Sequence, residues 1–130
     1  MERILVVCSD LAMTDNLTFV LQHSGFRIVN TAGSGQALAE IARSSPDLIL
    51  MRENCNRLNG DDLCIRIREL SDVPIIVLGQ EQVETAGVGF LEMGADAYLT
   101  SPLLLRELLA RIRSLLRRTQ TSLRNMRENS

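Results

Sequence analysis

The chain has 130 residues, of which 45% are hydrophobic, 23% charged and only 3% aromatic. That length suits one compact domain whose aliphatic core needs neither a disulfide nor a metal. Fourteen arginines and no lysine stand against sixteen acidic residues, and the net charge of -2 excludes a general electrostatic footprint for nucleic acid. No apolar stretch approaches the roughly 20 residues needed to cross a bilayer, so we expect a soluble, cytoplasmic protein without membrane contacts.

Apolar runs alternate with amphipathic stretches along the chain, which is typical of a parallel sheet covered by helices on both faces. The runs predict strands at residues 3–8, 26–31, 47–51, 73–78 and 97–100, and the amphipathic stretches predict helices at about 12–24, 35–44, 61–70, 82–93 and 104–118. Gly25 and Gly94 mark helix ends that need a left-handed residue, Pro46 closes the second helix, and Asn59-Gly60 predicts a turn.

Five strand–helix pairs with right-handed crossovers predict an α/β protein, a flavodoxin-like (βα)5 doubly wound parallel sheet with strand order 2-1-3-4-5. In this fold the site lies beyond the carboxyl ends of the strands. We place this domain at residues 1–118. From residue 119 the chain is polar without a sustained period, so residues 119–130 are interpreted as a linker or tail.

Three cysteines, Cys8, Cys55 and Cys64, are unevenly spaced, form no CxxC motif and follow no secretory signal. Reduced thiols are therefore expected. Cys8 ends the first strand and Cys55 follows the third, so both approach one rim of the sheet beside Arg52, whose charge would favour a thiolate. A redox sensor based on a Cys8–Cys55 link is one alternative, and Cys8 as an ordinary small buried residue is the other.

Several segments together resemble the receiver domain of bacterial two-component response regulators, over residues 3–118. The closing helix is similar to the OmpR and PhoB type, in which a winged-helix DNA-binding domain follows the receiver. The segments are RILVVCSD, HSGFRIV, PDLILMRENCNRLNGDDL, VPIIVLGQ, GADAYLTSPL and RELLARIRSLLRR.

The resemblance implies a pocket in which an aspartate after strand three accepts a phosphoryl group. An acid pair after strand one would bind Mg²⁺ with that aspartate, and a hydroxyl after strand four and a lysine after strand five would bind the phosphoryl oxygens. None of these groups is present here. The six positions of this degenerate pocket carry Cys8, Ser9, Asp10, Arg52, Gly79 and Ser101.

Arg52 stands at the acceptor position as a permanent cation that cannot attack phosphorus. Its guanidinium either pairs with Asp10 in place of the metal or extends into solvent. Glu53 follows directly, but strand alternation turns its side chain to the opposite face. We therefore expect no enzyme activity, no metal and no cofactor.

Tyr98 occupies the aromatic switch position on strand five that the resemblance implies. Because Gly79 offers no hydroxyl for it to follow, its ring either sits inward permanently or is an ordinary half-buried strand tyrosine. The resemblance also implies a homodimer through helix four, strand five and helix five. The matching charged positions are Asp96, Glu107, Arg111 and Arg118.

These observations predict an atypical receiver that works without phosphorylation, through protein contacts or dimerisation, and regulates a winged-helix transcriptional output. DNA would be contacted only through a separate effector domain, and the regulatory partner is not specified by the sequence. The alternatives are a receiver phosphorylated at a displaced acid, Glu53 or Asp10, a redox sensor, and a ligand-binding receiver anchored by Arg52.

Overall fold

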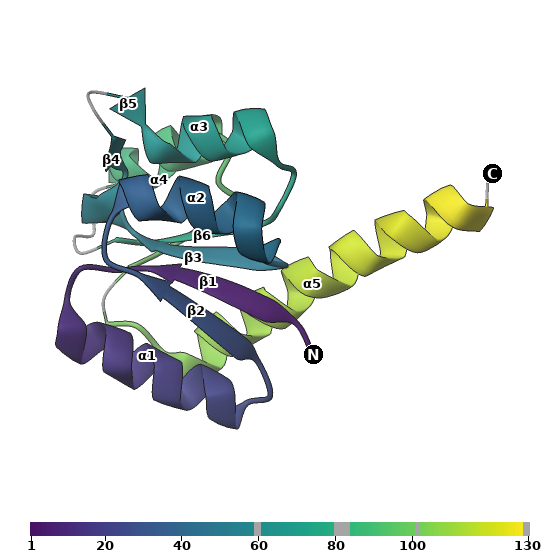
Figure 1. The fold of residues 1–130 in the computed structure, drawn as a ribbon, viewed down its shortest axis with the longest axis horizontal. Helices are drawn as coiled ribbons and strands as arrows, with labels where there is room; N and C mark the ends of the chain where they lie inside the picture. The colour runs from purple at the N-terminus through teal and green to yellow at the C-terminus, as the bar shows by residue number, and fades with distance from the viewer. Residues whose placement is uncertain (59–60, 80–83, 101, 129–130) are drawn as a thin grey trace.

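The computed structural model describes residues 1–58, 61–79, 84–100 and 102–128. Its elements alternate between strand and helix along the chain, with one short hairpin inserted after the third strand (Figure 1). In chain order they are β1 (Arg3–Val7), α1 (Leu11–His23), β2 (Arg27–Thr31), α2 (Ser34–Ser44), β3 (Leu48–Arg52), the 3-10 turn η1 (Glu53–Cys55), β4 (Arg57–Leu58), β5 (Asp61–Asp62), α3 (Leu63–Leu70), β6 (Ile75–Gly79), α4 (Glu84–Glu92), β7 (Ala97–Thr100) and α5 (Leu105–Glu128).

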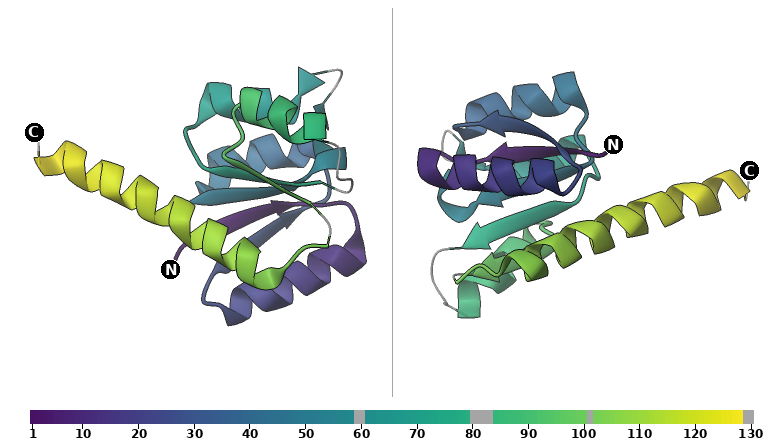
Figure 2. Two further views of the ribbon diagram at one scale, coloured as in Figure 1. Left: turned by 180° about the vertical axis from the view of Figure 1, so that it is seen from behind. Right: turned by 90° about the horizontal axis from the view of Figure 1, so that it is seen from below.

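The main sheet has five parallel strands in the order β2-β1-β3-β6-β7. Because β6 and β7 are its fourth and fifth strands along the chain, the predicted order 2-1-3-4-5 and the flavodoxin-like fold are confirmed. Helices α1 and α5 cover one face, while α2, α3 and α4 cover the other (Figures 1 and 2).

Alternate residues of the central strands feed two separate cores, since successive side chains of a strand point to opposite faces. Ile4 and Val6 pack with α1 and α5 in one cluster, whereas Leu5 and Val7 pack with α2, α3 and α4 in the other. This is why the run ILVV of β1 and the run IIVL of β6 are apolar throughout: strands covered on both faces need no polar side.

The predicted helix ends are confirmed where a left-handed residue was expected. Gly25 has φ of 96° after α1 and Gly94 has φ of 111° after α4. Ser45, directly before Pro46, closes α2 with a positive φ of 47°. The predicted Asn59-Gly60 turn lies outside the described residues, although β4 and β5, on its two sides, pair antiparallel.

Two elements differ from the sequence-based expectation. Asp61 and Asp62 form β5 and not the start of a helix, so α3 begins at Leu63. Residues 119–128, expected as a linker or tail, continue α5 as helix, because no glycine or proline interrupts the chain there. At 24 residues α5 is about 36 Å long and runs well past the sheet (Figure 2).

Among the described helices, none is both long and apolar enough to cross a membrane.

Candidate functional site

The carboxyl ends of the parallel strands bring the predicted pocket positions to one rim. Arg52 is the last residue of β3 and Gly79 the last of β6, and Arg52 is in register with Leu78 of that neighbouring strand. Cys8 directly follows β1 and stays tied to β2 through its backbone N–H, which donates to the Thr31 carbonyl at 3.0 Å. Ser101 lies outside the described residues.

Arg52 is half-buried and its guanidinium is poorly satisfied. The Nη1 group contacts the Met13 thioether sulfur of α1, and Nε is buried without a hydrogen-bond partner among the described residues. A thioether is a weak acceptor, and an unpaired buried N–H costs about 1–3 kcal/mol. The side chain is therefore neither extended into solvent nor held by a strong partner.

The ion pair considered between Arg52 and Asp10 is not present in the described structure. Asp10 instead forms the N-cap of α1, where its carboxylate accepts from the Met13 backbone N–H at 3.2 Å. That expectation was wrong because a carboxylate at the first turn of a helix has free backbone donors close by.

These residues do not fit a magnesium ion. Mg²⁺ takes oxygen ligands, usually carboxylates together with waters, and the pocket positions present a buried thiol at Cys8, a hydroxyl at Ser9 and a guanidinium at Arg52, while the single carboxylate, that of Asp10, caps α1. The Cys8 thiol is directed to the Asp10 carbonyl, with Sγ to O at 3.5 Å. In the described part of the chain, no cluster of three or more His, Cys, Asp or Glu residues could hold a metal.

Glu53 lies on the opposite side of the sheet from Arg52, as strand alternation predicts. Arg52 reaches Met13, which packs against the α1–α5 core, whereas the Glu53 Oε2 atom accepts a hydrogen bond of 3.1 Å from Tyr98 Oη. Tyr98 packs against the core on the α2–α3–α4 side. The two neighbouring side chains thus act in separate layers.

The Tyr98 ring occupies the space left by Gly79. A Cβ atom added at Gly79 would overlap Tyr98 Oη and Cζ and would lie 2.9 Å from Cε2. Real Cβ atoms do not approach other heavy atoms so closely, so a side chain at position 79 and this position of the ring exclude each other. The ring is turned toward Gly79 and is half-buried, so its position agrees with the inward alternative and its partial exposure agrees with that of an ordinary strand tyrosine.

Two residues of α4 complete the surroundings of the Tyr98 ring. Phe90 stacks against it, with ring centroids 5.7 Å apart and an interplanar angle of 16°. A Cβ atom at Gly87 would lie 3.1 Å from Tyr98 Cδ1, which is tighter than nearly all real contacts. Tyr98 is therefore contacted by two glycines, an aromatic ring and a carboxylate, which we call the Tyr98 pocket (Gly79, Gly87, Phe90 and Glu53), and its side chain remains partly exposed.

The three cysteines are buried and free, and Cys8 and Cys55 belong to different layers. Cys8 packs in the α1–α5 core and Cys55 in the core on the other face of the sheet. They are thus not brought together as the redox alternative requires. Burial raises the pKa of the Cys64 thiol above its usual 9.0; Arg68 opposes this rise, and Asp96 and Asp62 add to it.

One of the four charged residues of the candidate dimer face, Asp96, already forms an ion pair within the chain. Asp96 Oδ2 lies 3.1 Å from Arg68 Nη2 and also accepts from the Ile75 backbone N–H at 2.8 Å. Glu107, Arg111 and Arg118 on α5 are exposed and make no ion pair with another described residue. An open hollow of about 340 Å³ lies over this face, lined by Gly87, Val88, Leu91, Asp96, Ala97, Tyr98, Leu99 and Arg111.

Sequence reasoning missed the residues that hold Tyr98 and Asp96. Phe90 and Arg68 were not singled out, and no packing role was predicted for Gly87. The glycines at positions 79 and 87, together with the single tyrosine at position 98, are the sequence signal that could have suggested this packing. Nothing in the sequence links Arg68 to Asp96, since that contact depends on how α3 meets the loop before β7.

Comparison with known proteins gives one consistent result. The sequence profile of the response regulator receiver domain matches residues 4–113. The sensory transduction protein RegX3 of Mycolicibacterium smegmatis is 38% identical over 118 residues, which cover 91% of this chain and 52% of RegX3. The DNA-binding response regulator MtrA of the same organism is 38% identical over 119 residues, covering 92% and 52%.

Solved structures agree with the sequence matches. The receiver domain of TorR, a response regulator of the TMAO respiratory system, superposes with a TM-score of 0.83 at 33% identity, covering 91% of this chain and 98% of the other. The chain spans about half the length of the curated relatives it matches.

Proposed function

The chain belongs to the response regulator receiver domains of two-component systems, and we propose that this receiver acts without accepting a phosphoryl group, its switch residue Tyr98 being held inward by its own neighbours. The observation that carries this proposal is the Tyr98 ring seated where Gly79 lacks a side chain. In the family pattern, a hydroxyl at that position would respond to the phosphoryl group.

Arg52 supports the loss of phosphoryl transfer. A guanidinium remains protonated at any accessible pH and has no lone pair to form the bond to phosphorus. The neighbouring acids are also occupied: Asp10 caps α1 and Glu53 accepts from Tyr98. Phosphorylation at either displaced acid would have to break those contacts, which disfavours that alternative.

The output that we propose is a contact between copies of the chain through α4, β7 and α5. Val88 and Leu91 are exposed apolar residues on α4, and Arg111 lines the hollow beside them. Asp96 is held by Arg68, so the exposed charges available for pairs across such a dimer are those of α5. In the full protein this dimer would position winged-helix DNA-binding domains for transcriptional regulation.

Phosphotransfer is tested by incubating the protein with acetyl phosphate and Mg²⁺ and recording the intact mass. A receiver that retains the acid pair, the acceptor aspartate and the lysine serves as positive control. We expect the control to gain one phosphoryl group and this chain to keep its mass. A magnesium-dependent gain on this chain would contradict the proposal.

The dimer is tested by light scattering on the wild type and on Arg111→Glu. Reversing this charge on the proposed face should shift the molar mass toward the monomer. Arg27→Glu, an exposed arginine of β2 away from this face, is the matched control and should leave the mass unchanged. A wild type that is monomeric at high concentration would contradict this output and leave the account of phosphotransfer standing.

A further inference from the structure

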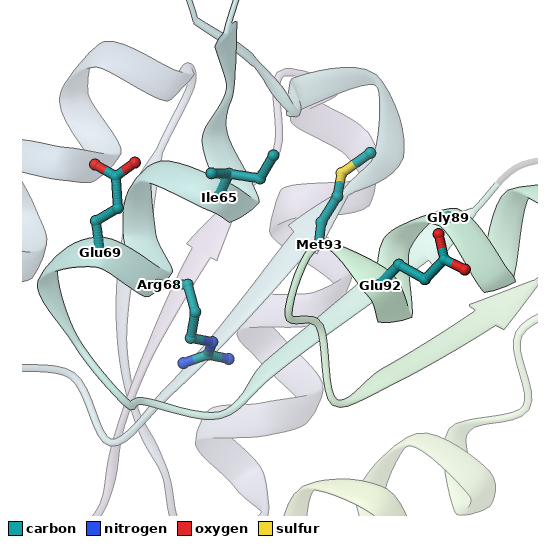
Figure 3. A pocket seen from close by; sticks show the side chains of 6 residues that line it. All are labelled: Ile65, Arg68, Glu69, Gly89, Glu92 and Met93. Carbon is teal, nitrogen blue, oxygen red and sulfur yellow. The ribbon is translucent and has the colours of Figure 1, made fainter.

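An open groove lies between α3 and α4. Its volume is about 580 Å³. In Figure 3 the Ile65 and Met93 side chains lie between the two helices, and the carboxylates of Glu69 and Glu92 lie on either side of them. The groove is lined by Ile65, Arg68, Glu69, Gly89, Glu92 and Met93.

The one cation of the groove has its donors committed within the chain. Arg68 Nε and Nη2 donate to the Gly94 carbonyl at 3.1 and 2.7 Å, and Nη1 donates to the Val73 carbonyl at 2.7 Å. Its charge is paired with Asp96. Arg68 therefore fixes the end of α3 against the loop after α4 and leaves the two glutamates to set the charge of the groove.

Glu69 and Glu92 make that charge negative. The nearest cation to Glu69 is Arg66, whose Nη1 lies 3.9 Å from Oε2, and both side chains are about half exposed. Such an exposed pair is weak and easily exchanged for another cation. Glu92 is exposed and has no ion pair with another described residue.

Gly89 lies at the floor of the groove, and no contact with another described residue requires a glycine at this position. A Cβ atom there would meet nothing within 4 Å, whereas a Cβ atom at Gly87 would crowd Tyr98. Glycine is disfavoured inside a helix relative to alanine, so Gly87 has a packing role within the domain and Gly89 has none. The open space over Gly89 is suited to a side chain of another molecule.

We propose that this groove binds an amphipathic α-helix of a partner protein, with an apolar stripe facing Ile65, Gly89 and Met93. Arginines or lysines beside the stripe would pair with Glu69 and Glu92. A groove between two helices accepts a third helix by ridge-and-groove packing, and the acidic rims select a basic partner. The proposal goes beyond the dimer proposed above and does not depend on it, because the dimer face uses the other side of α4.

The test uses a fluorescent Leu/Arg peptide of about 16 residues, about 24 Å as a helix, with leucines every three or four positions. A scrambled peptide of the same composition keeps the charge and loses the stripe. Fluorescence anisotropy should give saturable binding of the first peptide and at least about tenfold weaker binding of the second. Absence of saturable binding, or equal binding of the two peptides, would overturn the proposal.

Variants locate the contact. Gly89→Leu places a side chain in the groove, and because its Cβ atom would meet nothing within 4 Å, the variant should keep the melting temperature and weaken peptide binding at least about tenfold. Glu69→Gln with Glu92→Gln should weaken binding, and the loss should fade at high salt, where charges are screened. Asp15→Asn with Asp72→Asn removes the same charge from two exposed positions outside the groove lining and is the matched control.

Two results would contradict this assignment. The first is peptide binding by Gly89→Leu at wild-type affinity, or an equal loss in the control pair, which would place the peptide elsewhere. The second is a wild-type oligomer that Gly89→Leu converts to a monomer in light scattering, which would make the occupant a second copy of this chain and not a partner protein.

Discussion

Gly79 and Arg52 end adjacent strands, β6 and β3, and under our proposal they stand at positions where phosphotransfer groups are absent. At Gly79 the Tyr98 ring takes the space that a side chain would occupy. The ring stacks on Phe90, and its hydroxyl donates a hydrogen bond to Glu53. Position 52 instead carries a long arginine side chain, and its buried Nε has no hydrogen-bond partner in the described structure.

The difference separates two kinds of side-chain packing at one rim of the sheet. Around Tyr98 the changes are mutually consistent, and each supports a single packed arrangement, which is how a sequence specifies one state. Around Arg52 a buried N–H group is left unpaired, and this lowers stability. Substitutions should therefore harm the first region and can improve the second.

The largest effect is expected from Gly79→Thr, which places a side chain where the Tyr98 ring lies. The free energy of unfolding should fall by about 3 kcal/mol, the upper part of the range for overpacking a core. Urea denaturation measures it. Gly33→Thr, at a glycine with open space around it, controls for glycine substitution as such. An unchanged stability would mean that the ring does not occupy this space.

Arg52→Met should raise the free energy of unfolding by about 1–2 kcal/mol, because the unpaired Nε is removed and an apolar chain can contact Met13. Arg52→Ala separates the loss of the charge from the loss of packing and should be close to neutral. A loss of stability in both variants would indicate a partner for the guanidinium and contradict the contrast between the two regions.

Tyr98→Phe keeps the stacking on Phe90 and removes the hydroxyl that donates to Glu53. Stability should fall by about 1 kcal/mol, the usual net contribution of one hydrogen bond. The double variant with Glu53→Gln isolates the pair: if the bond is the only link, the second change should add little to the first. Additive losses would argue against a direct Tyr98–Glu53 bond.

The smallest effect concerns Cys64. Its pKa is raised in the folded state, so the folded chain holds this proton more tightly than the unfolded chain does. The associated stability is complete well below pH 9 and is lost as pH rises through 9 toward the raised value, at no more than about 1.4 kcal/mol per pH unit. The difference in stability between wild type and Cys64→Ala should shrink over that interval and stay constant below it.

Much of the fold could be predicted from sequence because local patterns decide it. Strands apolar on both faces and helix ends at Gly25 and Gly94 follow from burial and backbone conformation. The β4–β5 hairpin escaped prediction because two-residue strands carry no periodicity. The length of α5 was underestimated because a polar helix beyond the core has no apolar stripe to reveal it.

For the site, positions were predictable and contacts were not. The sequence places Arg52, Gly79 and Tyr98 at one rim, since topology alone brings strand ends together. Which partner a long side chain selects depends on competing groups nearby: the α1 backbone takes Asp10, and Arg52 is left against Met13.

Tyr98 is the single tyrosine of the chain, so one label reports on the central proposal. Fluorotyrosine incorporated at this position should give one fluorine NMR resonance that is unchanged by beryllofluoride and Mg²⁺. The Gly79→Thr variant supplies the reference for a displaced ring and should show a shifted resonance. A wild-type resonance that moves or splits when beryllofluoride and Mg²⁺ are added would show that the ring still switches and would contradict the account.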